Sequence, residues 1–172
     1  MKHLILPAAI GLLALGLLAF GWGSPRADFS GTWKLDMKSS KGLPSSFAMV
    51  KGYTMEVAQA ADSLVIHTEL GGPDGAVKFP ATIVTYTGAE VYREDTLRGS
   101  KRWISASWTT TGAKLIVTNR VIQRRPGGVE QHYTQTDVWQ FGKHRTLLIV
   151  VTQKFDQGDS THIEQRYFKR AG

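Results

Sequence analysis

Six glycine-containing turns, spaced 11 to 16 residues apart, constrain the fold of this 172-residue chain more than any other feature. Each turn separates two runs of β-forming residues. The turns are Thr87-Gly88-Ala89, Arg98-Gly99-Ser100, Thr111-Gly112, Pro126-Gly127-Gly128, Gly142-Lys143-His144 and Gln157-Gly158-Asp159. Such spacing predicts strands of roughly seven to ten residues, joined as nearest-neighbour hairpins. Upstream, residues 53–58 and 64–68 alternate in polarity around Ala61-Asp62 and predict another hairpin.

The predicted fold is therefore all-β, an antiparallel up-and-down meander barrel of about 8–10 strands. A long meander leaves two unpaired edges unless it closes, which favours a barrel over an open sheet. A half-barrel around a helix is the structural alternative. Pro80 cannot donate to a ladder, so it predicts an edge position or a bulge within residues 77–87. The linker at residues 37–50 breaks the alternation, and residues 47–50 are its apolar part.

The first strand of the predicted barrel lies at residues 28–36. Strand periodicity places Phe29, Gly31, Trp33 and Leu35 on one face, which forms an aromatic wall. A glycine two residues before a tryptophan lets another chain or a bulky side chain lie close, while the indole fills the space beside it.

This Gly-x-Trp strand resembles the opening strand of the lipocalins and fatty-acid-binding proteins, the calycin group, whose tryptophan plugs the closed end of a small barrel. The resemblance implies that Gly31 and Trp33 form the barrel floor and that residues 47–50 belong to a helix or lid. The wider pattern is similar to a bacterial family of exported lipocalin-like proteins that is itself poorly characterised. That likeness rests on the first strand together with Thr87-Gly88-Ala89-Glu90, Trp108 before Gly112, Val138-Trp139-Gln140-Phe141 and Phe168-Lys169-Arg170. It implies one lipocalin-like β-barrel domain over residues 28–170.

Residues 1–23 have the pattern of a secretory signal peptide, a hydrophobic helix ahead of the barrel. Lys2-His3 forms a short basic head, and residues 4–20 are an apolar run. Gly21-Trp22-Gly23 supplies the small residues that suit cleavage before Ser24.

If the leader is retained, residues 4–22 would instead anchor the chain in an inner membrane. The chain has no Cys, which excludes a disulfide framework and a lipid-modified amino-terminal Cys. We therefore expect a periplasmic or secreted protein. The net charge of +7 is spread over several segments, which suits solubility and contact with an anionic membrane surface and gives no basis for nucleic acid binding.

The turn at Thr111-Gly112 determines which residues of its two strands share a face. One face is apolar, with the cross-strand pairs Trp108–Leu115, Ala106–Val117 and Ile104–Asn119. The opposite face pairs Trp103 with Arg120, which predicts an exposed cation–π contact.

The length of the next loop decides which face of residues 129–141 points inward. A three-residue loop at Pro126-Gly127-Gly128 turns one set inward: Tyr133, Gln135, Asp137 and Trp139. A two- or four-residue loop turns the other set inward: Thr134, Thr136 and Val138. We favour the first register because Trp139 is too large to leave in water. Its polar neighbours would then line a wet cavity beside Asn119, and buried polar groups need partners or water.

The last strand raises the question of a carboxylate ligand. In the fatty-acid-binding proteins, which this chain resembles, a late Arg-x-Tyr grips a carboxylate. Here Arg166 and Tyr167 are adjacent and must lie on opposite faces, so that pair does not transfer intact. The resemblance to lipocalins predicts instead that Arg166 or Arg170 packs over Trp33. Anion binding by Arg166 is the alternative.

Motifs for catalysis and metal binding are missing. The five His show no ligand spacing, and no nucleophile elbow, Ser-x-x-Lys or phosphate loop occurs. His162 is the only candidate for a haem ligand, but residues 34–37 lack the glycines of the haem-binding calycin pattern. We therefore predict no metal, no cofactor and no enzymatic activity. An enzyme would need two ionisable groups in reach inside the barrel, such as Asp137 with His132 or Arg166.

The function predicted is binding of a small hydrophobic or amphipathic molecule in the barrel cavity, because barrels of this size are either filled or enclose one ligand. The candidate ligand-binding residues are Tyr53, Trp108, Asn119, Tyr133, Gln135, Asp137 and Arg166. The alternative is an envelope structural or interaction protein with a filled barrel. Residues 147–151 are apolar on both faces, which predicts outer cover by a helix, the Phe47 segment or another subunit.

Overall fold

The structure is a computed structural model that describes residues 25–95, 99–125, 127–158 and 160–171; the predicted signal segment, residues 1–23, lies outside this part of the chain. The strands are β1 (Gly31–Leu35), β2 (Gly52–Gln59), β3 (Ser63–Gly72), β4 (Gly75–Lys78), β5 (Thr82–Thr85), β6 (Val91–Asp95), β7 (Ser100–Trp108), β8 (Lys114–Arg124), β9 (Glu130–Phe141), β10 (Leu147–Phe155) and β11 (Thr161–Arg170). The described residues also form two short 3-10 helices, η1 (Ser45–Met49) and η2 (Lys143–Arg145), neither of which is long and apolar enough to cross a membrane.

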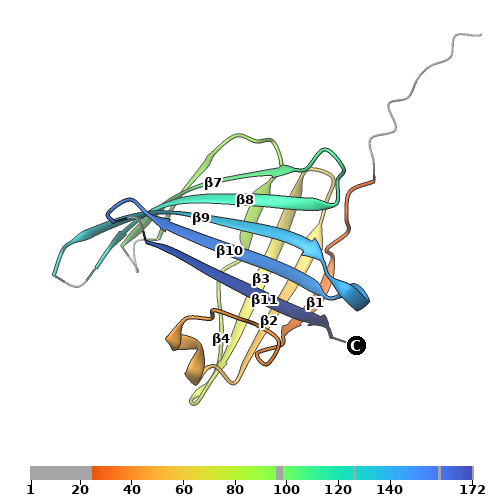
Figure 1. Ribbon diagram of the computed structural model, residues 1–172, viewed down its shortest axis with the longest axis horizontal. Helices are drawn as coiled ribbons and strands as arrows, with labels where there is room; N and C mark the ends of the chain where they lie inside the picture. The colour runs from red at the N-terminus through yellow and green to blue at the C-terminus, as the bar shows by residue number, and fades with distance from the viewer. Residues whose placement is uncertain (1–24, 96–98, 126, 159, 172) are drawn as a thin grey trace, which may run out of the picture.

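The described strands form one antiparallel sheet in the order β4-β3-β2-β1-β11-β10-β9-β8-β7-β6, with β5 paired to β3. Sequence neighbours are therefore spatial neighbours along most of the sheet, and the long strands β7 to β11 lie side by side (Figure 1). The pairing of β1 with β11 joins the first strand to the last. These pairings confirm the predicted all-β antiparallel meander.

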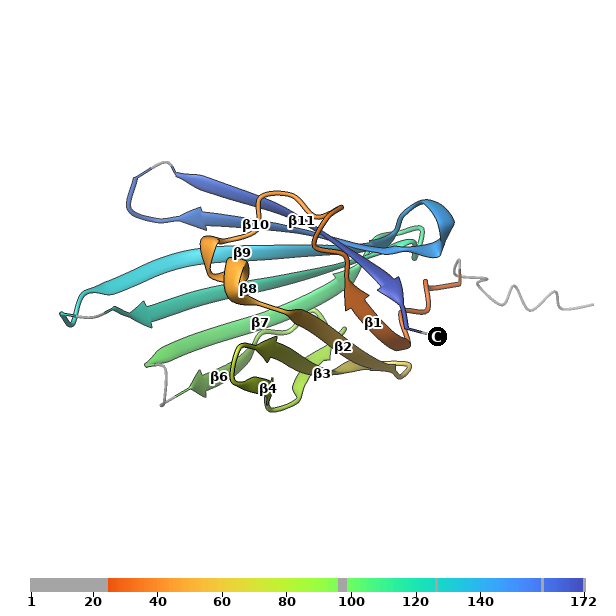
Figure 2. The same cartoon turned by 90° about the horizontal axis from the view of Figure 1, so that it is seen from below.

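The predicted number of strands, about 8–10, is too low because residues 77–87 do not form one strand. The chain leaves the sheet at Pro80, which has no N–H to donate, and so β4 and β5 are separate. Both strands pair with β3 rather than with each other. β5 then lies against β7, so that the curled sheet approaches itself there (Figure 2).

Aromatic side chains fill one end of the barrel. Phe29 is 0% and Trp33 1% exposed, and the Trp33 Nε1–H donates to the carbonyl oxygen of Phe29 at 2.9 Å. The Phe29 ring stacks on Trp108 at 5.7 Å and meets Trp139 edge-on at 5.8 Å between ring centroids. We call these four residues, Phe29, Trp33, Trp108 and Trp139, the aromatic floor.

Gly31 is required beside the floor for two reasons. Its φ of +131° is a conformation that residues with a Cβ rarely adopt, and a Cβ here would lie 2.9 Å from the Arg170 guanidinium. That guanidinium lies over the Trp33 ring, 5.3 Å from its centroid, and donates to the Ser30 carbonyl oxygen. Of the two arginines predicted to pack on Trp33, the structure selects Arg170 and not Arg166.

The ladder between β7 and β8 confirms the register predicted from the Thr111-Gly112 turn. Trp108 lies opposite Leu115, and Ile104 lies opposite Asn119. On the outer face, the Arg120 guanidinium lies 5.3 Å from the Trp103 ring centroid, as predicted.

The ladder between β8 and β9 confirms the favoured inward face of β9. Asn119 lies opposite Gln135, and Val117 lies opposite Asp137. The connecting loop, residues 125–129, is longer than the predicted three residues, since the ladder ends at Arg124 and Glu130. An odd number of loop residues keeps the same alternation, so the predicted face is unchanged.

β10 is apolar on both faces, as its sequence predicts. Leu147 and Val151 are buried inside, whereas Leu148 and Val150 are half-buried on the outer face. The Phe47 segment, one of the predicted covers for the outer face, does not lie there. Its ring stacks instead on the inward-facing Tyr53, at 6.2 Å between centroids.

A pair of tryptophan substitutions tests this assignment of faces. Trp33→Ala should lower the free energy of unfolding by about 3–5 kcal/mol, because a large buried aromatic leaves a cavity. Trp103→Ala, on the outer face, should cost about 1 kcal/mol or less. Urea denaturation of both variants measures the difference. The reverse order would mean that the floor and the outer face have been exchanged.

Candidate functional site

Polar side chains from neighbouring strands gather on the inner face of the sheet, beside the cross-strand row that contains Trp139. One cross-strand row runs through Asn119, Gln135, Gln153 and His162, and the next through Val117, Asp137, Val151 and Glu164. Arg166 follows on the same face of β11. We call this group the interior polar cluster: Asn119, Gln135, Asp137, Gln153, His162, Glu164 and Arg166.

A directional chain of hydrogen bonds crosses the middle of the cluster. Gln153 Nε2 donates to Gln135 Oε1, and Gln135 Nε2 donates to Asp137 Oδ1, both at 2.9 Å. The Asp137 carboxyl is therefore held at the end of a chain of two hydrogen bonds that begins at Gln153 on β10.

Arg166 is held by an acid on its own strand. Its Nε donates to Glu164 Oε2 at 2.7 Å, and its terminal nitrogen lies 2.6 Å from the same oxygen. The Glu164 side chain is only 1% exposed. His162 Nε2 lies 3.5 Å from the other oxygen of Glu164. Residues two apart share a face of a strand, which is why these three side chains meet.

Burial raises the pKa of Asp137 to about 6. The hydrogen bond from Gln135 and the positive charges of Arg166 and Arg102 act in the opposite direction, and the Glu164 carboxylate adds to the rise. Burial also raises the pKa of Tyr53, against the effect of the Arg166 charge. For both groups, desolvation therefore changes the pKa more than the neighbouring charges do.

The interior differs sharply between its two ends. Phe29 and Trp33 in the floor are 0% and 1% exposed, whereas the Arg166 side chain keeps 21% of its surface exposed. Gln135 and Asp137 also remain partly accessible, although they face inward. Solvent therefore reaches the inner face of the sheet at Arg166, Gln135 and Asp137 and is excluded at Phe29 and Trp33.

The structure brings together most of the predicted ligand-binding residues. Asn119, Gln135, Asp137 and Arg166 belong to the cluster, and Tyr53 joins them through Phe47, whose ring lies 5.6 Å from the Arg166 guanidinium and 6.2 Å from the Tyr53 ring. Helix η1, which carries Phe47, thus covers this side of the cluster.

Two predicted residues lie apart from the cluster. Trp108 belongs to the aromatic floor, where Tyr86 meets it edge-on at 5.4 Å. Tyr133 lies one cross-strand row beyond Gln135, with its ring 5.5 Å from that of Phe155.

Sequence reasoning missed Gln153, His162 and Glu164 as members of one site. The alternation of residues along β10 and β11 was the available signal. Once Asp137 is assigned to the inner face, the pairing of β9 with β10 and of β10 with β11 determines which residues of those strands also face inward. His132, by contrast, lies on the other face of β9, with 42% of its side chain exposed. It therefore does not join Asp137 in the interior.

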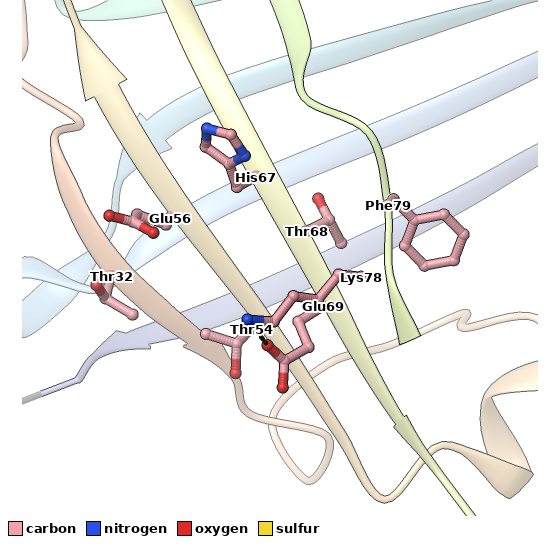
Figure 3. A pocket seen from close by; sticks show the side chains of 8 residues that line it. All are labelled: Thr32, Thr54, Glu56, His67, Thr68, Glu69, Lys78 and Phe79. Carbon is pink, nitrogen blue, oxygen red and sulfur yellow. Dashed lines mark ion pairs between the residues drawn. The ribbon is translucent and has the colours of Figure 1, made fainter. Parts of the chain in front are cut away.

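A separate groove of about 280 Å³ lies on the outer face of β1 to β4 (Figure 3). Its lining includes Thr32, Thr54, Glu56, His67, Glu69 and Lys78. The ion pair between Lys78 and Glu69, at 3.8 Å, has side chains that are 83% and 43% exposed, so water and salt screen it. Nowhere in the described part of the chain do three or more His, Cys, Asp or Glu side chains gather so that they could hold a metal ion.

Comparison with protein-family models and with curated proteins finds no match. Among solved structures, a crystal structure of zebrafish ileal bile acid-binding protein complexed with cholic acid matches with a TM-score of 0.50 and 21% sequence identity. The match covers 84% of this chain and 100% of that chain. The chain therefore has a calycin-like fold, in agreement with the resemblance of its first strand.

The raised pKa of Asp137 predicts a specific pH dependence of stability. The unfolded carboxyl titrates near 3.8 and the folded one near 6, so the native state holds this proton more tightly. The resulting stabilisation is present below about pH 4 and is lost as the pH rises through about 6. Relative to Asp137→Asn, the wild type should lose up to roughly 3 kcal/mol of unfolding free energy between these limits.

Urea denaturation of both proteins across this pH range measures the effect. The carboxylates that the two proteins share cancel in the difference. A difference that does not change with pH would contradict the assignment of Asp137 to a desolvated site.

Proposed function

We propose that this protein binds a small hydrophobic or amphipathic molecule inside its barrel. The observation that carries the proposal is the division of the interior into a sealed aromatic floor and a solvent-accessible polar cluster. A ligand with an apolar body and a polar end matches that division, because apolar surface gains by leaving water and a polar group needs partners.

The calycin-like fold supports this proposal. The zebrafish protein of the same architecture is described as a bile acid-binding protein complexed with cholic acid. Small barrels either fill their interior with side chains or enclose one ligand. A filled barrel, the alternative function class, would exclude water from inward side chains at both ends, and the partial exposure of Gln135 and Asp137 argues against it.

We assign the protein no catalytic role. Glu164 does lie close to two ionisable groups on the inner face, Arg166 and His162. A guanidinium cannot exchange a proton at physiological pH as an acid or base would, and the sequence holds no catalytic motif around the contact between His162 and Glu164. The leader at residues 1–23 supports export to the periplasm or outside the cell, where the positive net charge would favour contact with anionic membrane surfaces.

Matched substitutions on β9 test the proposal. Gln135→Trp places a large ring inside the barrel, whereas Thr136→Trp places the same ring on the outer face of the same strand. With Nile red as an uncharged fluorescent probe, Gln135→Trp should weaken binding at least about tenfold, equivalent to about 1.4 kcal/mol. Thr136→Trp should bind like the wild type.

Circular dichroism checks that both variants fold. Equal loss of binding in the two variants, or no loss in Gln135→Trp, would place the probe outside the interior and contradict the proposal.

A further inference from the structure

We propose that the interior selects a ligand whose polar end is an uncharged, oxygen-bearing group, such as an alcohol or ester, and rejects a carboxylate. This inference rests on the proposed function, because it concerns a ligand held inside the barrel. Three features support it. Arg166 already has a counter-ion, the charges of the interior balance, and hydrogen-bonding atoms beside the cluster lack partners.

Arg166 already has its counter-ion. Glu164 is 1% exposed and meets the guanidinium at 2.6 and 2.7 Å, so the pair is formed before any ligand arrives. A ligand carboxylate that bound Arg166 would have to displace Glu164 or share the guanidinium with it. Displacement would leave a buried carboxylate without its partner, which is strongly unfavourable.

The charges around the site also balance. Arg102 and Arg166 both act on the Asp137 carboxyl, and so does Glu164, which places two arginines and two acids in one electrostatic environment. With Asp137 ionised these four groups sum to zero. A carboxylate that entered would lose its hydration without meeting a net positive charge, whereas an uncharged group would lose far less.

The cluster and its surroundings hold polar atoms that lack partners in the described part of the chain. Trp139 Nε1 and Arg102 Nε are buried and make no hydrogen bond. Trp139 is 4% exposed and is the next inward-facing residue after Asp137 on β9. Both atoms are obligatory donors, and each needs an acceptor oxygen. A hydroxyl or ester oxygen supplies one without bringing a charge.

Isothermal titration calorimetry with three probes of one chain length tests the inference at neutral pH. The probes are monododecanoylglycerol, dodecanoate and dodecyltrimethylammonium, which are uncharged, anionic and cationic. Monododecanoylglycerol should bind at least about tenfold more tightly than either ion. Dodecanoate or the cation binding equally well or better would overturn the inference and leave the proposed function standing. Failure of all three to bind would overturn the proposed function and this inference with it.

A variant tests the cause of the selectivity. Glu164→Gln removes the counter-ion of Arg166, so the affinity for dodecanoate should rise about tenfold while that for monododecanoylglycerol changes less than about twofold. Glu56→Gln, on the outer face, removes the same charge from the chain and should change neither affinity. No gain for dodecanoate in a folded Glu164→Gln protein would overturn the role given to Glu164. The ranking of probes on the wild type stands as a test even if this variant does not fold.

Discussion

The pairing of the first strand with the last is the constraint on which the rest of the barrel depends. β1 contributes only five residues, yet it joins β2 to β11 and so connects the two halves of the sheet. Arg170 reinforces this connection, because it lies over Trp33 in the space that Gly31 leaves open. Trp33 in turn supports the aromatic floor. Without the pairing of β1 with β11 the sheet would separate into two parts, with new unpaired edges at β1 and β11, and the core would lose its seal.

Closure at the floor allows the other end of the interior to be polar. The two largest fully buried side chains, Trp33 and Phe29, lie at the floor, whereas two neighbouring rows of β9, β10 and β11 carry amides and charges. Those groups are tied to one another by hydrogen bonds, which limits the cost of burying them. The division between a dry end and a wet end is therefore a consequence of where the chain places its aromatic residues.

Much of this arrangement could be predicted from the sequence. Side chains alternate between the two faces of a strand, so the inward residues of one strand determine the inward residues of the strand that pairs with it. The assignment of Trp139 inward was enough to place Gln135 and Asp137 correctly. What depended on contacts between distant segments could not be predicted. The pairing of both β4 and β5 with β3, the stacking of Phe47 on Tyr53, and the position of the Phe47 ring beside Arg166 each require knowledge of which surfaces meet in space.

Intermolecular nuclear Overhauser effects test the central claim, an amphiphile bound inside the barrel, most directly. The methyl groups of Ile104 and Leu70 lie on the inner face of the sheet, whereas those of Ile116 and Val150 lie on its outer face. With isotope-labelled protein and unlabelled monododecanoylglycerol, the account predicts contacts from the alkyl chain to Ile104 and Leu70 and none to Ile116 and Val150. Contacts confined to the outer methyl groups, or to the groove beside His67, would contradict it.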